Sequence, residues 1–225
     1  MAARVRIGLI GMVAGLIAMV GVGTALAASV NSESPLGTVG VQKSEVSLGD
    51  LVTDAVRTSL EADIALVSAS ELKERDVQIP KGKVSTQDVV AFIAYTDDPL
   101  VEMRLTGKQI RQALERSVLI YPQKNLGFLQ VSGLRFSFDP SKPQGSRVTS
   151  VRIGDKGGKP LSDDETYSVG MTSSLANGAL GYWKIWSKND IARPTQKTIP
   201  QAVEEFFSSR SSINYSNLNR IIVGG

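Results

Sequence analysis

The sequence predicts a single α+β domain with a mixed sheet, because helix and strand patterns are interleaved along the chain without strict alternation. From Leu48 to Leu60, apolar residues recur at the helical spacing of three and four. In the later segments 101–105, 134–138 and 167–171, apolar and polar residues alternate with the period of a strand. A doubly wound parallel sheet would require a helix between successive strands throughout, and the pattern does not supply one.

The N-terminal segment 1–27 has the parts of a secretory signal peptide. Arg4 and Arg6 form a basic start, residues 7–22 are apolar or Gly, and Ala25-Leu26-Ala27 is a small-x-small cleavage pattern. We therefore expect an exported protein, either secreted or held in the periplasm or cell envelope. The alternative is an uncleaved anchor, since the uncharged stretch is long enough to reach across a bilayer, and only this segment would then contact the membrane.

The folded part is expected to begin after a linker. Residues 28–46 are polar and contain Gly, Ser and Pro, so we interpret them as this linker, with one domain over 47–225. The first helix opens that domain, and a short apolar run at 64–67 then indicates a buried strand. Ser85 or Thr86 is a candidate N-cap for the short helix that follows.

The second half of the chain continues the same mixture. Thr106 is a favourable N-cap for a helix that reaches Val118, and Pro200 suits the first turn of a last helix at 199–207. The segment 177–183 is expected to be a loop. Further strands are expected at 101–105, 128–138, 147–153, 167–171 and 220–223.

Composition excludes several classes of function. The chain has no Cys and no His, so it cannot form a Ser-His-Asp triad, a Cys-His dyad or a metal centre with His ligands. We expect no catalytic residue, no metal site and no cofactor. Of the 25 Lys and Arg residues, Arg4 and Arg6 lie in the predicted signal peptide, which leaves 23 against 22 Asp and Glu. This balance gives no reason to expect a nucleic-acid partner.

Short motifs match a known domain in five segments, in order along the chain. Residues 128–136 read FLQVSGLRF, which matches the corresponding motif almost letter for letter. Residues 48–57 read LGDLVTDAVR, close to LGNLVADAMR, and residues 174–182 read SLANGALGY, close to FLANGGDGY. The other two segments are 62–64 and 105–115. Together they resemble the C-terminal, substrate-binding domain of the 5′-nucleotidase and 2′,3′-cyclic phosphodiesterase family.

The resemblance implies both a fold and a role. In complete members of that family, an N-terminal calcineurin-like domain carries two metals on Asp, His and Asn ligands. The C-terminal domain binds the base and sugar of the substrate and turns it toward those metals. A chain without His cannot supply that metal centre. The resemblance therefore implies a binding domain that lacks the catalytic half.

The first substrate loop of the family has the form N-G-G-x-I-R. Its glycines let the backbone approach the ligand, and its Arg supplies a planar fork of donors. Residues 68–73 take its place here, without the glycines, and Lys73 stands where the Arg would be. Lys73 is thus a candidate ligand contact, and the alternative is an ordinary charged surface loop.

The second substrate loop of the family has the form P-F-G-N, and its Phe stacks on the base. Residues 94–97 take its place, so Tyr95 is the candidate stacking ring. Asp97 or Asp98 would play the part of the Asn. The alternative is a Tyr packed at the end of a helix with a capping Asp behind it.

The third substrate loop of the family supplies a second stacking Phe and an Asp beside the sugar or base. Ser174 and Leu180 occupy these positions here, so the ring and the carboxylate are both lost. Tyr182, Trp183 and Trp186 lie just beyond and are candidates for a rebuilt aromatic face. The alternative for all three is packing in the core or at an interface.

These residues leave several functions open. The first is an exported, non-catalytic module that binds a nucleotide or nucleoside through Lys73, Tyr95, Asp97, Tyr182 and Trp183. The second is a subunit of a nucleotide-catabolic hydrolase that pairs with a separate metallophosphoesterase chain. The third is a structural or interaction protein of the envelope whose groove has closed. Hydrolysis by this chain alone, as a 5′-nucleotidase, is opposed by the absence of His.

Overall fold

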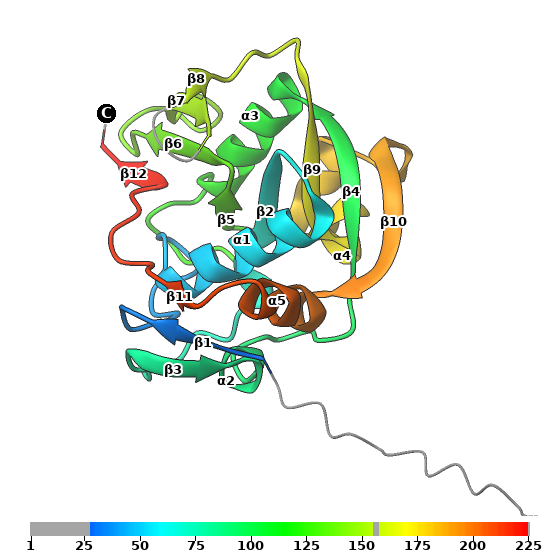
Figure 1. Ribbon diagram of the computed structural model, residues 1–225. Helices are drawn as coiled ribbons and strands as arrows, with labels where there is room; N and C mark the ends of the chain where they lie inside the picture. The colour runs from blue at the N-terminus through cyan, green and yellow to red at the C-terminus, as the bar shows by residue number, and fades with distance from the viewer. Residues whose placement is uncertain (1–27, 155–157, 225) are drawn as a thin grey trace, which may run out of the picture.

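The central sheet consists of β2 (Ile64–Ser68), β4 (Pro99–Thr106), β5 (Leu129–Ser132), β9 (Thr166–Thr172) and β10 (Ile191–Thr198) (Figure 1). Their order across the sheet is β10-β4-β9-β2-β5. β2 runs parallel to β9, whereas β4 is antiparallel to both β9 and β10. The predicted α+β class with a mixed sheet is confirmed.

This computed structural model describes residues 28–154 and 158–224. The predicted signal peptide, 1–27, lies outside the described residues. Among the residues that are described, no helix is both long and apolar enough to cross a membrane.

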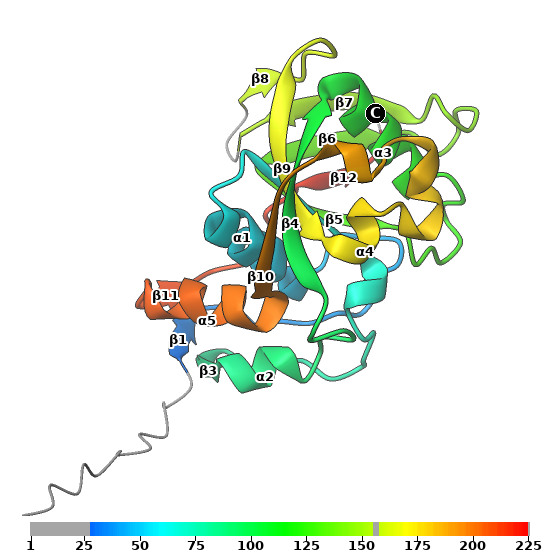
Figure 2. The ribbon, with the colours of Figure 1, turned by 90° about the vertical axis from the view of Figure 1, so that its right-hand side faces the viewer.

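Helices cover both faces of the central sheet, with α1 on one side and α3 and α4 on the other (Figure 2). They are α1 (Ser47–Leu60), α2 (Thr86–Val90), α3 (Gly107–Ser117), α4 (Ser173–Ala176) and α5 (Ile199–Ser208). α1 packs on β2, β5 and β9 and also contacts α5. Its predicted apolar stripe is buried at 0–1% exposure and consists of Leu48, Leu51, Val52, Ala55, Val56 and Leu60.

Two smaller sheets flank the central one, with the orders β11-β1-β3 and β12-β6-β7-β8. Their strands are β1 (Ser29–Ser32), β3 (Gly82–Ser85), β6 (Leu134–Phe138), β7 (Val148–Ile153), β8 (Lys159–Pro160), β11 (Ser212–Ile213) and β12 (Ile221–Val223). Short 3-10 turns complete the fold: η1 (Ala69–Glu71), η2 (Ala179–Lys184) and η3 (Lys188–Asp190).

The prediction that residues 28–46 form a linker is wrong. β1 pairs antiparallel with β3 and parallel with β11, which lies near the other end of the chain. Val30, Leu36 and Val41 are buried at 0–3% exposure. These apolar residues stand singly among polar ones, so no local period reveals them. The folded part therefore begins well before residue 47.

The helix starts predicted from capping residues are confirmed. The Ser85 hydroxyl accepts a hydrogen bond from the backbone N–H of Asp88 at 3.3 Å, at the start of α2. The Thr106 hydroxyl accepts one from the N–H of Gln109 at 3.2 Å, at the start of α3. In both cases the side chain of the third helical residue bonds back to the N-cap backbone, which completes a capping box.

The two polar residues of the predicted segment 101–105 differ in exposure. Arg104 is exposed, whereas Glu102 is only 9% exposed. Neighbouring β10 covers it, and Arg193 of that strand donates to the Glu102 carboxylate through Nε at 3.0 Å and Nη2 at 2.8 Å. Glu102 and Arg104 lie on the same face of β4, and the ion pair with Arg193 accounts for the lower exposure of Glu102.

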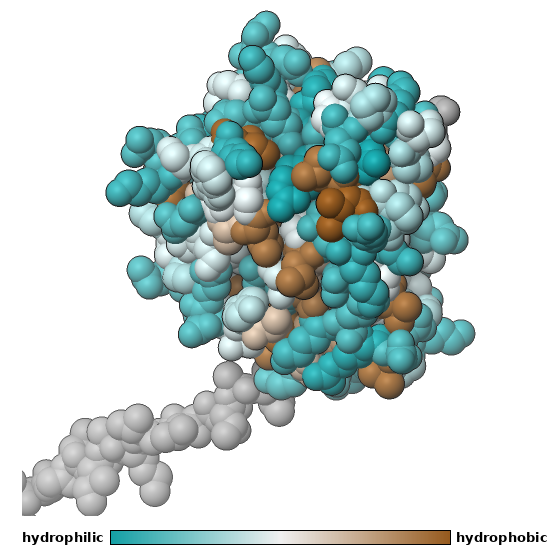
Figure 3. All heavy atoms as spheres, turned by 180° about the vertical axis from the view of Figure 1, so that it is seen from behind, coloured by the Kyte–Doolittle hydropathy of each residue, from teal (hydrophilic) through white to brown (hydrophobic). Residues whose placement is uncertain are grey.

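The outer surface carries its apolar residues in separate patches. Seen from behind, these patches are interrupted by hydrophilic residues and do not merge into one continuous area (Figure 3). The large apolar side chains that are most exposed are Trp183, Val77, Tyr95, Val39 and Leu126, at 52–67%. Scattered exposure of this kind is usual, so a functional surface must be argued from individual residues.

Candidate functional site

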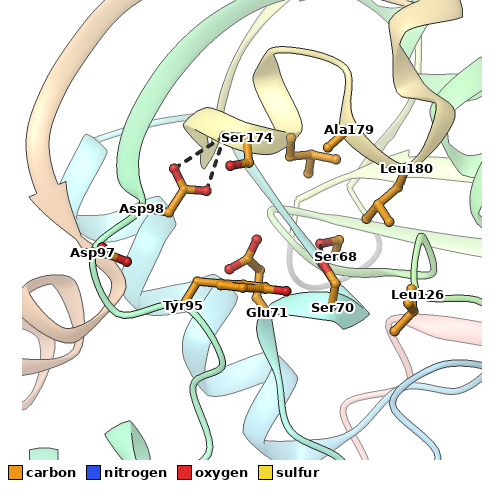
Figure 4. A pocket seen from close by; sticks show the side chains of 11 residues that line it. Ser68, Ser70, Glu71, Tyr95, Asp97, Asp98, Leu126, Ser174, Ala179 and Leu180 are labelled. Atoms are coloured by element: carbon orange, nitrogen blue, oxygen red, sulfur yellow. Dashed lines mark hydrogen bonds between the residues drawn. The ribbon is translucent and has the colours of Figure 1, made fainter.

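The candidate site is a pocket at one edge of the central sheet. Because β2 and β9 are parallel and β4 opposes them, the carboxyl ends of β2 and β9 meet the start of β4 at this edge. Three segments that follow or precede those strand ends, 68–71, 95–98 and 174–180, line a pocket of about 480 Å³ (Figure 4). The resemblance assigned the substrate loops to these same segments, and the structure brings them together.

Tyr95 contributes an aromatic ring to this pocket. Its side chain is 56% exposed, so the ring is not packed away at the end of a helix. Figure 4 shows it lying along one side of the pocket beside Glu71. Asp97 also lines the pocket and is exposed. An accessible ring next to carboxylates offers a flat face for stacking together with hydrogen-bond acceptors.

Glu71 is the buried polar group of the pocket, and the sequence had not singled it out. It is only 3% exposed, and its carboxyl group points into the pocket (Figure 4). The hydroxyl of Thr172 donates to Oε1 at 3.2 Å, while Oε2 has no hydrogen-bond partner among the described residues. Burial, together with the nearby charge of Asp98, raises the pKa of Glu71 to about 7 against the opposing effect of the Thr172 hydrogen bond.

Asp98 is hydrogen-bonded to the third loop, at Ser174. Its carboxylate accepts the backbone N–H of Ser174 at 3.2 and 3.3 Å (Figure 4). The bond joins the start of β4 to the start of α4 and fixes the width of the pocket on that side. Asp98 therefore has a structural partner within the protein.

Lys73 is not brought into the pocket. It lies just beyond the lining segment, and its side chain is exposed. Its backbone N–H donates to the carbonyl of Phe92 at 2.8 Å, and its carbonyl accepts the hydroxyl of Thr38 at 2.9 Å. These bonds fix the backbone of the loop. As a ligand contact, Lys73 stays a prediction that the pocket geometry does not favour.

Tyr182 is a core residue, which corrects its proposed role as a ligand contact. Its exposure is 0%, and its hydroxyl donates to the carbonyl of Gly127 at 2.7 Å. Its ring stacks on that of Trp186 with centroids 4.8 Å apart. The indole N–H of Trp186 donates to the carbonyl of Leu175 at 2.9 Å. This pair supports the wall of the pocket from behind, since Leu175 lines it.

Trp183 faces a different depression from Tyr95. It is 67% exposed and lines a separate hollow of about 490 Å³ with Leu119 and Ile185. The Lys184 ammonium lies 5.3 Å from the centre of its ring. Tyr95 and Trp183 therefore do not share one cleft.

Metal ligation has no geometric basis in the part of the chain that the structure covers. Within residues 28–154 and 158–224, no three His, Cys, Asp or Glu side chains are grouped so that they could hold a metal ion. The hydroxyls of Ser68 and Ser70 hydrogen-bond to each other at 2.7 Å and not to a general base.

Comparison with known proteins places this geometry in a family. The family model described as "5'-nucleotidase, C-terminal domain" matches residues 22–187. The chain is similar to an apyrase of Aedes albopictus, with 27% identity over 80% of this chain and 32% of that protein. It is also similar to a 5′-nucleotidase of Homo sapiens, with 30% identity over 66% of this chain and 28% of that protein.

A solved structure agrees with these relatives. The 5′-nucleotidase precursor from Thermus thermophilus superposes with a TM-score of 0.76 and 30% identity, over 88% of this chain and 39% of that one. The chain spans about a third of the curated relatives it matches. By the family match and the shared fold, this chain belongs to the 5′-nucleotidase C-terminal domain family.

Proposed function

We propose that this protein is a non-catalytic binding module that takes a nucleoside-like ligand in the pocket at the ends of β2, β4 and β9. The exposed ring of Tyr95 on that pocket is the observation that carries the proposal. The volume of about 480 Å³ lies in the usual range for small-molecule sites. A base stacked on an aromatic side chain gains about 1–3 kcal/mol. Every base has a flat face and can stack in this way.

Replacement of Tyr95 by alanine is expected to weaken nucleoside binding by about tenfold to a hundredfold, because the stacking surface is lost. Isothermal titration calorimetry with adenosine and guanosine measures this directly. A second readout is the fluorescence of Trp186, whose indole bonds to the pocket residue Leu175. For that readout, Trp183 is first changed to Phe, so that Trp186 is the one tryptophan left.

The matched control is Trp183→Ala, which removes an exposed aromatic ring from the separate hollow. Its nucleoside affinity is expected to equal that of the wild type. If wild-type protein gives no heat and no fluorescence change with nucleosides up to millimolar concentration, the proposal fails. Equal losses in the two variants would place the ligand elsewhere or show a general effect on folding.

The absence of autonomous catalysis is part of the same proposal. The chain has no His, and the pocket serines bond to each other. Incubation of the purified protein with nucleotides and added Mn²⁺ or Co²⁺ is expected to release no phosphate above a blank. Hydrolysis that is lost on substitution of a pocket residue would contradict this.

A second candidate function is a subunit that pairs with a separate metallophosphoesterase chain. It is favoured by an exposed aromatic side chain, Trp183, that lies outside the Tyr95 pocket. The hollow around Trp183 is the candidate contact surface, because its indole is 67% exposed and aromatic side chains are enriched in protein–protein interfaces. Co-purification with a metallophosphoesterase chain would support this candidate function if Trp183→Ser reduces the amount of that chain recovered. A protein that purifies as a monomer without any such chain would count against it.

Export is proposed from the pattern of residues 1–27. N-terminal sequencing of the protein recovered from the medium or the envelope fraction is expected to begin at Ala28. An intact Met1 in the membrane fraction would instead show that the segment is kept as an anchor.

A further inference from the structure

We infer that the pocket beside Tyr95 selects flat-ring ligands that carry a positive charge and rejects phosphorylated ones. The inference rests on the proposed use of this pocket for binding, and it names the charge class of the ligand. It departs from the expectation that a domain of this family binds an anionic nucleotide.

The charges that line the pocket all have one sign. Its ionisable carboxyl side chains are Glu71, Asp97 and Asp98. Of the lining residues in the described part of the chain, none is Lys or Arg. Lys73, which would take the place of the family Arg, lies outside the lining. A ligand phosphate would therefore meet carboxylates with no compensating cation, which is unfavourable in a partly desolvated site.

Glu71 distinguishes the pocket from an ordinary acidic surface, because it is a buried carboxyl group that points into the pocket. The residue is 97% buried, given its 3% exposure, yet its carboxyl group points into the pocket (Figure 4). Thr172 satisfies Oε1, whereas Oε2 has no partner among the described residues. A buried acceptor without a partner is costly, and a ligand N–H placed in the pocket would remove that cost. A charged N–H donor would do so most effectively, because hydrogen bonds between ions are the stronger ones.

Tyr95 adds the preference for a flat, charged ring. Its face is accessible, and it lies beside Glu71 in the pocket (Figure 4). The face of an aromatic ring carries negative quadrupole charge, so it attracts a cation as well as stacking on a planar group. A cationic heterocycle can stack on Tyr95 and present an N–H edge to Glu71 at the same time.

A metal ion would be the other positively charged occupant. The carboxylates of this pocket do not meet the arrangement that a metal needs, since the described residues hold no group of three suitable ligand side chains. Asp98 is also committed to the N–H of Ser174. An organic cation needs only one or two acceptors and a ring face, which is what the pocket offers.

Calorimetry with matched ligands tests the charge preference. Near neutral pH, 1-methyladenosine carries a positive charge on the base, adenosine is neutral, and adenosine 5′-monophosphate is an anion. We expect affinity to fall in that order, with about tenfold between successive ligands, which corresponds to about 1.4 kcal/mol each. A second series uses N-methylquinolinium, quinoline and quinoline carboxylate, which have similar ring area and no sugar.

Glu71→Gln identifies the side chain responsible. It keeps the shape of the residue and removes its charge, so the preference for 1-methyladenosine over adenosine is expected to shrink to less than about threefold. The control is Val77→Ala, which shortens an exposed apolar side chain outside the pocket and should keep the full preference.

The outcomes separate this inference from the proposed function. If adenosine 5′-monophosphate binds as tightly as 1-methyladenosine, the charge preference is overturned while nucleoside binding stands. If only the quinolinium series binds in the expected order, nucleoside binding fails and the charge preference stands. If neither series binds, or if Glu71→Gln leaves the order unchanged, the inference is overturned.

Discussion

Replacing Arg220 by alanine is expected to lower the free energy of unfolding by about 3–5 kcal/mol, because it breaks a buried ion pair on one side only. Arg220 is 7% exposed and stands immediately before β12. Its Nη2 lies 2.9 Å from Asp54 Oδ2, and its Nη1 donates to the carbonyl of Val131 at 3.0 Å. Urea unfolding followed by circular dichroism measures the loss.

Asp54, on α1, is the carboxylate that makes this pair. Asp50 lies farther from the guanidinium, with 3.7 Å between Arg220 Nε and Oδ1. Burial raises the pKa of Asp50, against the opposing effect of Arg220. Removal of Arg220 would take away the cation that lies 2.9 Å from the Asp54 carboxylate, which Tyr215 and Ser132 also hydrogen-bond. The loss of that pairing is the main source of the expected destabilisation.

The control for this prediction is Arg104→Ala. Arg104 is 59% exposed and lies 3.5 Å from Glu102, so its loss is expected to cost less than about 1 kcal/mol. Arg220→Met keeps the apolar stem and separates lost packing from lost charge. If Arg220→Ala unfolds at the same urea concentration as wild type, the buried pair contributes nothing to stability. The C-terminal segment would then be attached to α1 by its other contacts alone.

Much of the fold could be predicted because the relevant signals are local. The stripe of α1 repeats with the helical period, and every member of it is buried. Thr106 and Gln109 are three residues apart and form a capping box, which fixes the start of α3 without help from distant residues. Strands such as β6 alternate because one face packs inward.

The error at residues 28–46 has the opposite cause. Asn31 of β1 is paired with Ser212 of β11, and on its other side with Lys83 of β3. Neither partner is near in sequence, and a four-residue strand has too few positions to show a period of two. Strand β1 is stabilised by pairing with strands that only the folded chain brings near. The sequence of residues 28–46 alone therefore has the features of a linker.

The site was predicted in part, because the resemblance supplied positions but not surroundings. Tyr95 and Asp97 line the pocket, as their loop position suggested. Tyr182 does not, because its hydroxyl finds the carbonyl of Gly127 and the whole side chain is buried. Glu71 was missed because a Glu after a short strand usually faces water. Glu71 is buried as the last residue of the short turn η1, and no local pattern indicates that burial.

Glu71→Gln is expected to raise the free energy of unfolding by about 3 kcal/mol near pH 9 and to change it by less than about 1 kcal/mol near pH 5. Burial raises the pKa of Glu71 from 4.5 to about 7 in the folded protein. The folded state therefore binds this proton more tightly than the unfolded state does. Its stabilising contribution is complete below about 4.5 and is lost as the pH rises through 7. Urea unfolding of both proteins across this range measures the difference, in which other titrating groups cancel.

The control is Glu204→Gln, an exposed Glu on α5, which is expected to stay within about 0.5 kcal/mol of wild type at every pH. A Glu71→Gln curve that runs parallel to wild type from pH 5 to 9 would show that Glu71 titrates normally and is not held in an apolar environment. If the difference in the free energy of unfolding between Glu71→Gln and wild type instead grows with rising pH, the Glu71 carboxylate lowers the stability of the wild-type protein. A group that costs stability in the free protein and points into a pocket is suited to a ligand that supplies the missing donor. The same variant should then be the more stable protein and the weaker binder of cationic rings.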